Sequence, residues 1–288
     1  MTTLDELESF CRHRGTLQAD AKWTESLAPR KLEELEFHNR DRDTTVTLSA
    51  DEQERYHDNR KFYATSEASE RYLQDWLRIN ASGKILLDYA CGNGNFALKA
   101  LKHGARCVVG IDISDVSVRN STARAADAGF SDRCVFLQAD CEDTQLPAGS
   151  FDVIWCSGML HHLDLSHAFP EIRRLLRPQG VVFCHEALKH NPVIQWYRDR
   201  TPEMRTAWEK EHILGLQDLR FASHFFDVRN VRYWHLLAPL ASFFKRNRMM
   251  FAASLACFDL MDVLLTRVPL LQLMAWQFTF ELHKKSEK

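Results

Sequence analysis

Short apolar runs alternate with amphipathic stretches along the middle of the chain. The short runs have the length and composition of buried strands, and the stretches between them repeat their apolar residues at helical spacing. The expected strands are residues 85–89, 107–111, 134–138, 151–156 and 181–185, with helices at 96–103, 114–128 and 165–176. This alternation predicts an α/β fold, in which a mostly parallel sheet carries helices on both faces.

The regions on either side of this pattern differ from it. Residues 1–80 are polar, charged and helical in pattern, and Ser49 with Glu52 forms a capping-box signature ahead of a helix that runs to Tyr63. A second helix is expected at residues 66–77. The predicted organisation is an N-terminal helical cap (1–80), a core (81–190) and a C-terminal part that completes the sheet (191–288).

The C-terminal part contains a long apolar insertion. Residues 228–234 and 276–282 alternate as strands do, and the apolar helical stretch 240–273 lies between them. This insertion could form an acceptor pocket, a homodimer face, a membrane-resting surface or a plain packed helical pair. Three basic residues beside it would suit an anionic lipid surface: Lys245, Arg246 and Arg248. On a helical wheel Asp259, Asp262 and Thr266 share one side, opposite Ala253, Cys257, Leu260, Met261 and Leu264.

Composition narrows the class of protein. The 288 residues are 45% hydrophobic and 26% charged with a net charge of -2, which is ordinary for a soluble globular chain and gives no general attraction to nucleic acid. The eight cysteines are scattered without a Cys-x-x-Cys pair, so we expect reduced thiols and no disulfide framework or metal site. Neither a signal peptide nor an uncharged apolar stretch of about 18 residues is evident, which favours the cytoplasm and leaves peripheral membrane contact open.

A glycine-containing turn follows the first expected strand, over residues 90–94. Gly92 and Gly94 lack the Cβ atoms that would keep a ligand away from the backbone. A strand, such a turn and then a helix form the first half of a nucleotide-binding βαβ unit. The glycine spacing is tighter than Gly-x-Gly-x-x-Gly, which disfavours an NAD-dependent oxidoreductase.

Acidic residues follow the next two expected strands. Asp112 can accept both hydroxyls of an adenosine ribose, as a carboxylate in this position does in nucleotide-binding sheets. Asp140 can receive an adenine amino group, with Cys141 supplying a backbone contact, although Asp140 also fits a helix N-cap. Because ligands of such sheets bind at the carboxyl ends of the strands, these residues predict one site.

Six motifs follow one another in order across this region. They are 87–94 (LDYACGNG), 110–114 (GIDIS), Ala139-Asp140, 151–154 (FDVI), 160–163 (LHHL) and 175–180 (LLRPQG). Together they resemble the class I S-adenosylmethionine-dependent methyltransferases, in particular the group that contains ubiquinone/menaquinone and natural-product enzymes. The resemblance covers residues 84–186 and implies a Rossmann-like sheet with S-adenosylmethionine as the cofactor.

The resemblance also implies a set of cofactor contacts. It comprises Asp88, Ala90, Cys91, Gly92, Gly94, Asp112, Ile113, Asp140, Cys141 and Ser157. Asp88 would anchor the turn, a role that equally fits a simple cap, and Cys91 fits packing. Ala90 stands where the family usually has glycine, and Gln179 replaces another common glycine.

Methyl transfer from a sulfonium is an in-line displacement, for which the protein supplies alignment and exclusion of water. A general base is needed only for an acceptor that is protonated at the working pH. The candidates are His162, the first choice, then His161 and His185, with Glu186 beside the acceptor. The His-His pair also fits an orienting or capping role. The aromatic residues Tyr56, Phe62 and Tyr63 could cover the cationic methyl group or form a helix packing face.

The expected function is methyl transfer to a small molecule, apolar or lipid-like, at oxygen, nitrogen, sulfur or carbon. One alternative is a protein that binds the cofactor or its product S-adenosylhomocysteine without turnover, as a sensor or partner subunit. RNA methylation is disfavoured by the charge balance and by residues 157–160 (SGML), where an Asn-Pro-Pro-Tyr-like motif would stand.

Overall fold

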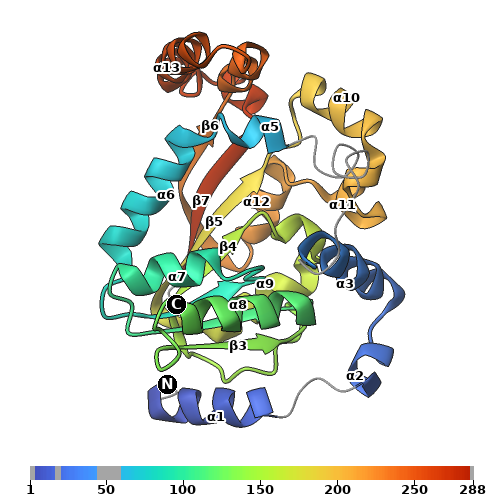
Figure 1. Cartoon of the computed structure of the whole chain (residues 1–288), viewed down its shortest axis with the longest axis vertical. Helices are drawn as coiled ribbons and strands as arrows, with labels where there is room; N and C mark the ends of the chain where they lie inside the picture. Colours follow the sequence, from blue (N-terminus) through green and yellow to red (C-terminus); the bar gives the residue numbers. More distant parts are fainter. Residues whose placement is uncertain (1–3, 17–20, 44–59, 286–288) are drawn as a thin grey trace.

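The computed structural model describes residues 4–16, 21–43 and 60–285. Its centre is a seven-stranded sheet in the order β3-β2-β1-β4-β5-β7-β6 (Figure 1). The strands are β1 (Ile85–Tyr89), β2 (Cys107–Asp112), β3 (Cys134–Gln138), β4 (Phe151–Ser157), β5 (Leu176–Ala187), β6 (Phe226–Trp234) and β7 (Gln277–Lys284). The first five pair in parallel, and β7 runs antiparallel between β5 and β6. The expected mostly parallel Rossmann-like sheet is confirmed.

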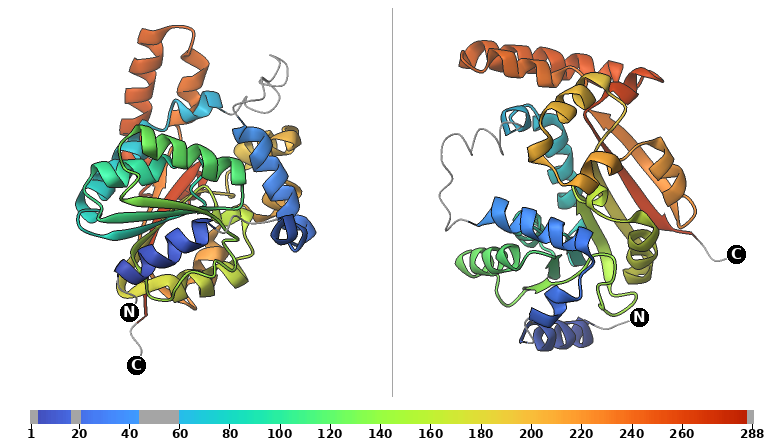
Figure 2. Two further views of the ribbon diagram at one scale, coloured as in Figure 1. Left: turned by 60° about the horizontal axis from the view of Figure 1, so that its bottom comes forward. Right: turned by 90° about the vertical axis from the view of Figure 1, so that its right-hand side faces the viewer.

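Helices cover both faces of the sheet (Figure 2). One face carries α6 (Glu67–Asn80), α7 (Asn95–Lys102) and α8 (Asp115–Asp127), and the other carries α1 (Leu4–Thr16), α9 (Leu165–Leu175) and α12 (Leu216–Ala222). On the first face Trp155 stacks between Phe96 and Phe183, with ring centroids 4.1 and 4.5 Å apart. This buried aromatic stack packs α7 against β4 and β5.

Local capping explains where the helices begin. The hydroxyl of Ser114 accepts the backbone N–H of Ser117 at the start of α8, and the carboxylate of Asp164 accepts that of Ser166 at the start of α9.

The remaining helices outside the insertion are α2 (Ala21–Glu25), α3 (Pro29–Arg42), α5 (Arg60–Tyr63), η1 (Leu160–His162), α10 (Pro192–Arg200), η2 (Pro202–Met204) and α11 (Ala207–His212). The predicted capping box at Ser49 and Glu52, and Tyr56 after it, lie outside the described residues.

The apolar insertion is not one continuous helix. It divides into η3 (Ala238–Phe244), α13 (Arg248–Leu265) and η4 (Leu271–Met274). The side chain of Asn247 accepts the N–H groups of Met249 and Met250 and so starts a new helix, while Leu270, with a φ of 72°, turns the chain after it. The insertion joins β6 to β7 and projects from one end of the molecule (Figure 2).

Within the described parts of the chain, no helix combines the length and apolar character that crossing a bilayer requires.

Candidate active site

The glycine-containing turn folds as the sequence predicts. Ala90, Gly92 and Gly94 all have positive φ angles, of 59°, 51° and 70°. A Cβ atom on Gly94 would come within 3.1 Å of the Ser121 side chain, a tight approach, and the φ of 70° is a conformation that glycine adopts without strain. Ala90 adopts the left-handed conformation that glycine would adopt without strain, which accounts for the family's usual choice there.

Asp88 holds this turn from behind. Its carboxylate is buried and accepts the backbone N–H of Ala97 at 3.1 Å, in the first turn of α7. Burial raises the pKa of Asp88 to about 7, and the charge of the nearby Asp112 adds to the increase. The hydrogen bond from the Ala97 N–H acts in the opposite direction and lowers the pKa. Asp88 lines neither of the two cavities described below, so its role is to shape the turn.

Asp112 connects the end of β2 to the same turn. Its carboxylate accepts the backbone N–H of Gly92 at 2.8 Å and that of Ser114 at 2.9 Å. It is also covered by Arg42, whose Nη1 lies 3.2 and 3.3 Å from its two oxygens and 2.8 Å from the hydroxyl of Ser117. The acid predicted to hold a ribose is therefore paired with a cation in this structure.

Two other basic residues of α3 pair with the acids that follow β3. Lys31 Nζ lies 2.5 Å from Asp140 and 2.8 Å from Glu142, and Arg30 lies 2.6 Å from Glu142. Burial lowers the pKa of Lys31, but its hydrogen bonds to the two acids outweigh that effect and leave the pKa raised. These basic residues were not identified from the sequence, because nothing local ties the charged helix 29–42 to strand ends far along the chain.

A small cavity of about 90 Å³ remains beneath α3. Of the predicted cofactor residues, Ala90, Asp112, Ile113, Asp140, Cys141 and Ser157 line it. Its volume is well below the roughly 300 Å³ at which sites for drug-sized ligands begin. Arg42 and Lys31 of α3 line this cavity together with Asp112 and Asp140, the acids with which they pair.

A larger cavity of about 710 Å³ adjoins the small one. Both are lined by His38, Arg42, Ser157, Gly158 and His162. Its aromatic and aliphatic wall includes Phe62, Tyr63, Val193, Trp196, Tyr197, Met204, Leu240, Phe243 and Trp276. Two of the three residues of the predicted aromatic cover, Phe62 and Tyr63, thus face this cavity, where they contact the rings of Tyr197 and Trp276 at centroid distances of 5.4 and 5.2 Å.

A histidine–carboxylate pair lies in the wall of the larger cavity. Glu186 accepts the backbone N–H groups of Met159 and Leu160, each at 3.0 Å, and lies 2.7 Å from His161 Nδ1. Burial of the ring disfavours its protonated form, but the hydrogen bond and charge of Glu186 outweigh burial and raise the pKa of His161. The carboxylate fixes the ring with Nδ1–H toward Glu186, which leaves Nε2 to accept a proton. Nε2 lies 3.9 Å from the carboxylate of Glu209, which also raises the pKa of His161.

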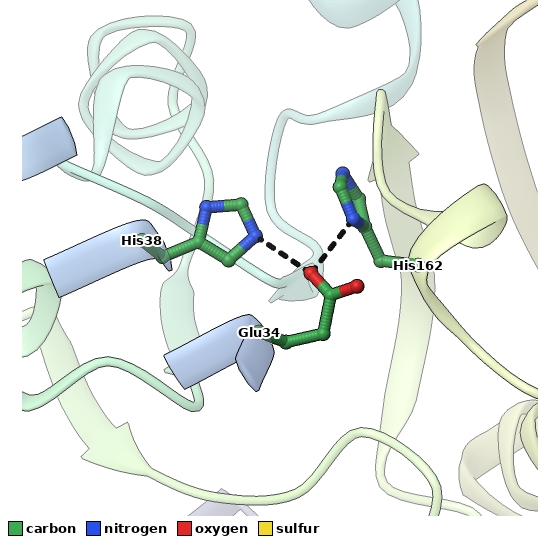
Figure 3. A group of neighbouring side chains, drawn as sticks. All are labelled: Glu34, His38 and His162. Carbon is green, nitrogen blue, oxygen red and sulfur yellow. Dashed lines mark ion pairs between the residues drawn. The ribbon is translucent and has the colours of Figure 1, made fainter. Parts of the chain in front are cut away.

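His162, the first choice from the sequence, has different partners (Figure 3). Its Nδ1 lies 2.9 Å from Glu34 Oε2, which is also 3.5 Å from His38 Nε2, while the other Glu34 oxygen accepts the Thr206 hydroxyl at 2.5 Å. Burial holds the pKa of His38 well below its usual value, so this ring is neutral. The three facing ligand atoms lie within 4.8 Å of one another and are of the type that could hold a divalent metal ion.

His185 is held between two neutral groups. Its Nε2–H donates to Gln277 Oε1 at 3.0 Å, and its Nδ1 then accepts the Ser157 hydroxyl at 3.2 Å. Burial lowers the pKa of His185. Both ring nitrogens are engaged, so His185 is less suited than His161 to take a proton.

Comparisons with known proteins agree with this fold. Residues 87–184 match the family described as methyltransferase domain. A segment of 118 residues is 39% identical to 27-O-demethylrifamycin SV methyltransferase from Amycolatopsis mediterranei, covering 41% of this chain and 43% of that protein. Over 152 residues the chain is 30% identical to sterol 24-C-methyltransferase from Aspergillus fumigatus, covering 52% of this chain and 39% of that protein.

A solved structure extends the likeness beyond the core. Geranyl diphosphate C-methyltransferase from Streptomyces coelicolor superposes on 90% of this chain and 99% of its own with a TM-score of 0.61 at 13% identity. The expected resemblance to class I methyltransferases is confirmed. The matched segments span less than half the length of each of these two curated relatives.

Proposed function

Because residues 87–184 form a methyltransferase domain, we propose that this chain transfers the methyl group of S-adenosylmethionine to a small apolar or lipid-like acceptor. One observation carries the proposal: the small cavity at the strand ends adjoins a large apolar cavity, and Ser157, Gly158 and His162 line both. A donor in the first and an acceptor in the second would meet at these residues. The apolar wall of the larger cavity supports a hydrophobic acceptor.

The residues at the strand ends suit the cofactor. The carboxylate of Asp112 would hold the ribose hydroxyls, and Asp140 with the backbone of Cys141 would hold the adenine. The turn at Ala90, Gly92 and Gly94 would pass close to the methionine part, with Asp88 keeping its shape. Arg42 and Lys31 must release the two acids for this to happen, so α3 acts as a cover that moves when the cofactor enters.

His161 is the residue best placed to take a proton from the acceptor. When bound, S-adenosylmethionine supplies an electrophilic methyl group and needs no activation by the protein. Glu186 holds the His161 ring and stabilises the imidazolium that forms when Nε2 accepts a proton. The aromatic and aliphatic wall excludes water from the reacting atoms.

The cysteines support a reducing compartment. All eight are free thiols, and seven of them are buried. Free thiols are typical of the cytoplasm, where disulfides are rare. We therefore place the protein in the cytoplasm. The net charge of -2 gives no general attraction to nucleic acid, so we propose no nucleic acid partner. A homodimer stays a proposal that gel filtration would test.

Calorimetric titration with S-adenosylhomocysteine tests the cofactor site. We expect binding by the wild type, no binding by Asp112→Ala and Asp140→Asn, and unchanged binding by Asp127→Ala, which removes an exposed acid of α8. Binding of NAD instead, or of neither ligand, would overturn the proposal.

Mass spectrometry of reactions with a panel of apolar acceptors tests turnover. A methylated product that requires the wild-type His161 and Glu186 supports the enzyme. Tight binding of S-adenosylhomocysteine without any product across the panel would favour the sensor or partner-subunit alternative.

A further inference from the structure

The helix α13 exposes the side that a surface helix normally buries. Its exposed residues are Arg248, Met249, Met250, Ala252, Ala253, Ala256, Cys257, Leu260, Met261, Val263 and Leu264. Only the first of these is charged, and Met249, Leu260 and Leu264 are 82%, 71% and 66% exposed. A helix that rests on a protein core shows the opposite arrangement, with its polar side toward water.

The side of α13 that faces the protein carries both of its acids beside apolar residues, among them Leu255, which packs on Ala238 and Ala241 of η3. Asp262 is buried and accepts the backbone N–H groups of Leu237 at 2.8 Å and Ala238 at 3.2 Å. Asp259 lies 3.9 Å from Arg71 of α6. These contacts fix the rotation of the helix, so its apolar side cannot turn inward without leaving the N–H groups of Leu237 and Ala238 unpaired.

The apolar surface extends to the mouth of the acceptor cavity. Phe243 of η3 is 80% exposed, and Val193 and Trp196 of α10 are 71% and 56% exposed. All three also line the larger cavity, which the proposed function assigns to the acceptor. The two elements lie with α13 at the same end of the molecule (Figure 1).

The exposed charges of the insertion itself are basic. Lys245, Arg246 and Arg248 precede or open α13, and Arg267 follows it. The only acids of residues 238–274 are Asp259 and Asp262, on the inward side. The surface therefore combines an apolar helix side with basic residues at both ends, although the whole chain has a net charge of -2.

We propose that the exposed side of α13 and the adjoining η3 rest in the headgroup region of an anionic lipid bilayer. An interfacial helix has this combination of an apolar side and flanking basic residues. A second copy of the chain suits this surface less well. Whether the two α13 helices pair parallel or antiparallel, basic residues of one copy meet basic residues of the other.

The position of the cavity mouth adds a consequence that rests on the proposed function. An acceptor dissolved in the bilayer reaches the apolar cavity past Val193, Trp196 and Phe243 without crossing water. The acceptor class is then a membrane-resident lipid or a similarly apolar molecule.

Co-sedimentation with vesicles tests the surface. The wild type should pellet with vesicles of phosphatidylcholine and phosphatidylglycerol, pellet less with phosphatidylcholine alone, and lose binding as salt is raised. The double variant L260E/L264E should bind at least about tenfold more weakly, since it places charge in the apolar side. The matched control is Ile79→Glu, which changes an exposed apolar residue of α6 on another surface and should bind like the wild type.

Two results would overturn the proposal. One is a wild type that does not pellet with the anionic vesicles. The other is a wild-type dimer in gel filtration that L260E/L264E converts to monomer while vesicle binding stays unchanged. Binding of S-adenosylhomocysteine by each variant is measured separately, so failure of the membrane surface is distinguished from failure of the cofactor site.

Discussion

Arg42 and Asp112 are paired in the wall of the small cavity, with the guanidinium Nη1 3.2 and 3.3 Å from the two carboxylate oxygens. The pair joins the end of α3 to the end of β2. It occupies the carboxylate that the proposed function assigns to the ribose, so cofactor and arginine compete for one partner.

Removing the arginine should therefore strengthen cofactor binding. We expect Arg42→Ala to lower the dissociation constant for S-adenosylhomocysteine by about fivefold, which corresponds to the loss of a partly exposed ion pair. Calorimetry measures this, with Arg40→Ala as the control on the same helix. Weaker binding by Arg42→Ala would show instead that Arg42 turns to hold the cofactor.

The buried Asp88 should make stability depend on pH. Its pKa is raised from 3.8 to about 7, so between these values the folded protein holds a proton that the unfolded chain has released. The contribution of Asp88 to the free energy of unfolding is then fully present below the unfolded pKa and decreases as pH rises toward about 7.

The variant Asp88→Asn should remove this dependence, because the amide oxygen can still accept the Ala97 N–H and carries no charge. Thermal unfolding at about pH 5 and about pH 8 should show that the substitution raises the melting temperature more at the higher pH. An equal change at both values would mean that Asp88 does not titrate in this range.

The pair of His161 and Glu186 predicts a shift in the pH–rate profile. Since His161 must be neutral to take a proton and its pKa is raised, kcat should rise with pH to a plateau above the usual histidine range. Glu186→Gln removes the charge that raises the pKa, so the rise should move to lower pH while the plateau falls by about 10²-fold.

The control for this experiment is Glu211→Gln, at an exposed position of α11. A profile that moves with His162 substitutions and ignores Glu186→Gln would restore the choice made from the sequence. An acceptor that needs no deprotonation would give a flat profile in every variant.

The cluster of Glu34, His38 and His162 predicts an outcome for metal removal. One oxygen of Glu34 already accepts the Thr206 hydroxyl, and methyl transfer from a sulfonium needs no activation by a metal ion. We expect turnover to change by less than about twofold after dialysis against a chelator. Activity that is lost and then restored by one divalent metal would identify the cluster as a metal site.

Features that depend on neighbouring residues could be predicted from the sequence. The limits of β1 and β3 are those expected, because short apolar runs end at polar residues and each strand end is followed by a turn or an acid. The turn at Ala90, Gly92 and Gly94 was equally readable from its composition.

Long-range pairs could not be read in this way. Arg42 and Asp112 meet only because α3 packs over the sheet edge, which no periodicity within residues 29–42 specifies. His161 and His162 are neighbours in sequence, yet the turn of η1 directs one toward Glu186 and the other toward Glu34. Which histidine has the orienting carboxylate depends on that turn and not on residue type.

The placement of β7 between β5 and β6 makes the apolar insertion an enlarged hairpin loop between two paired strands. Closing a longer loop costs little additional entropy once the strands are paired. A longer loop at residues 238–274 is therefore expected to keep the registers of β1, β2, β3 and β4, none of which pairs with β6 or β7. In evolutionary terms, the proposed acceptor cavity wall and the proposed membrane surface would diversify together in this loop, apart from the strand ends proposed to bind the cofactor.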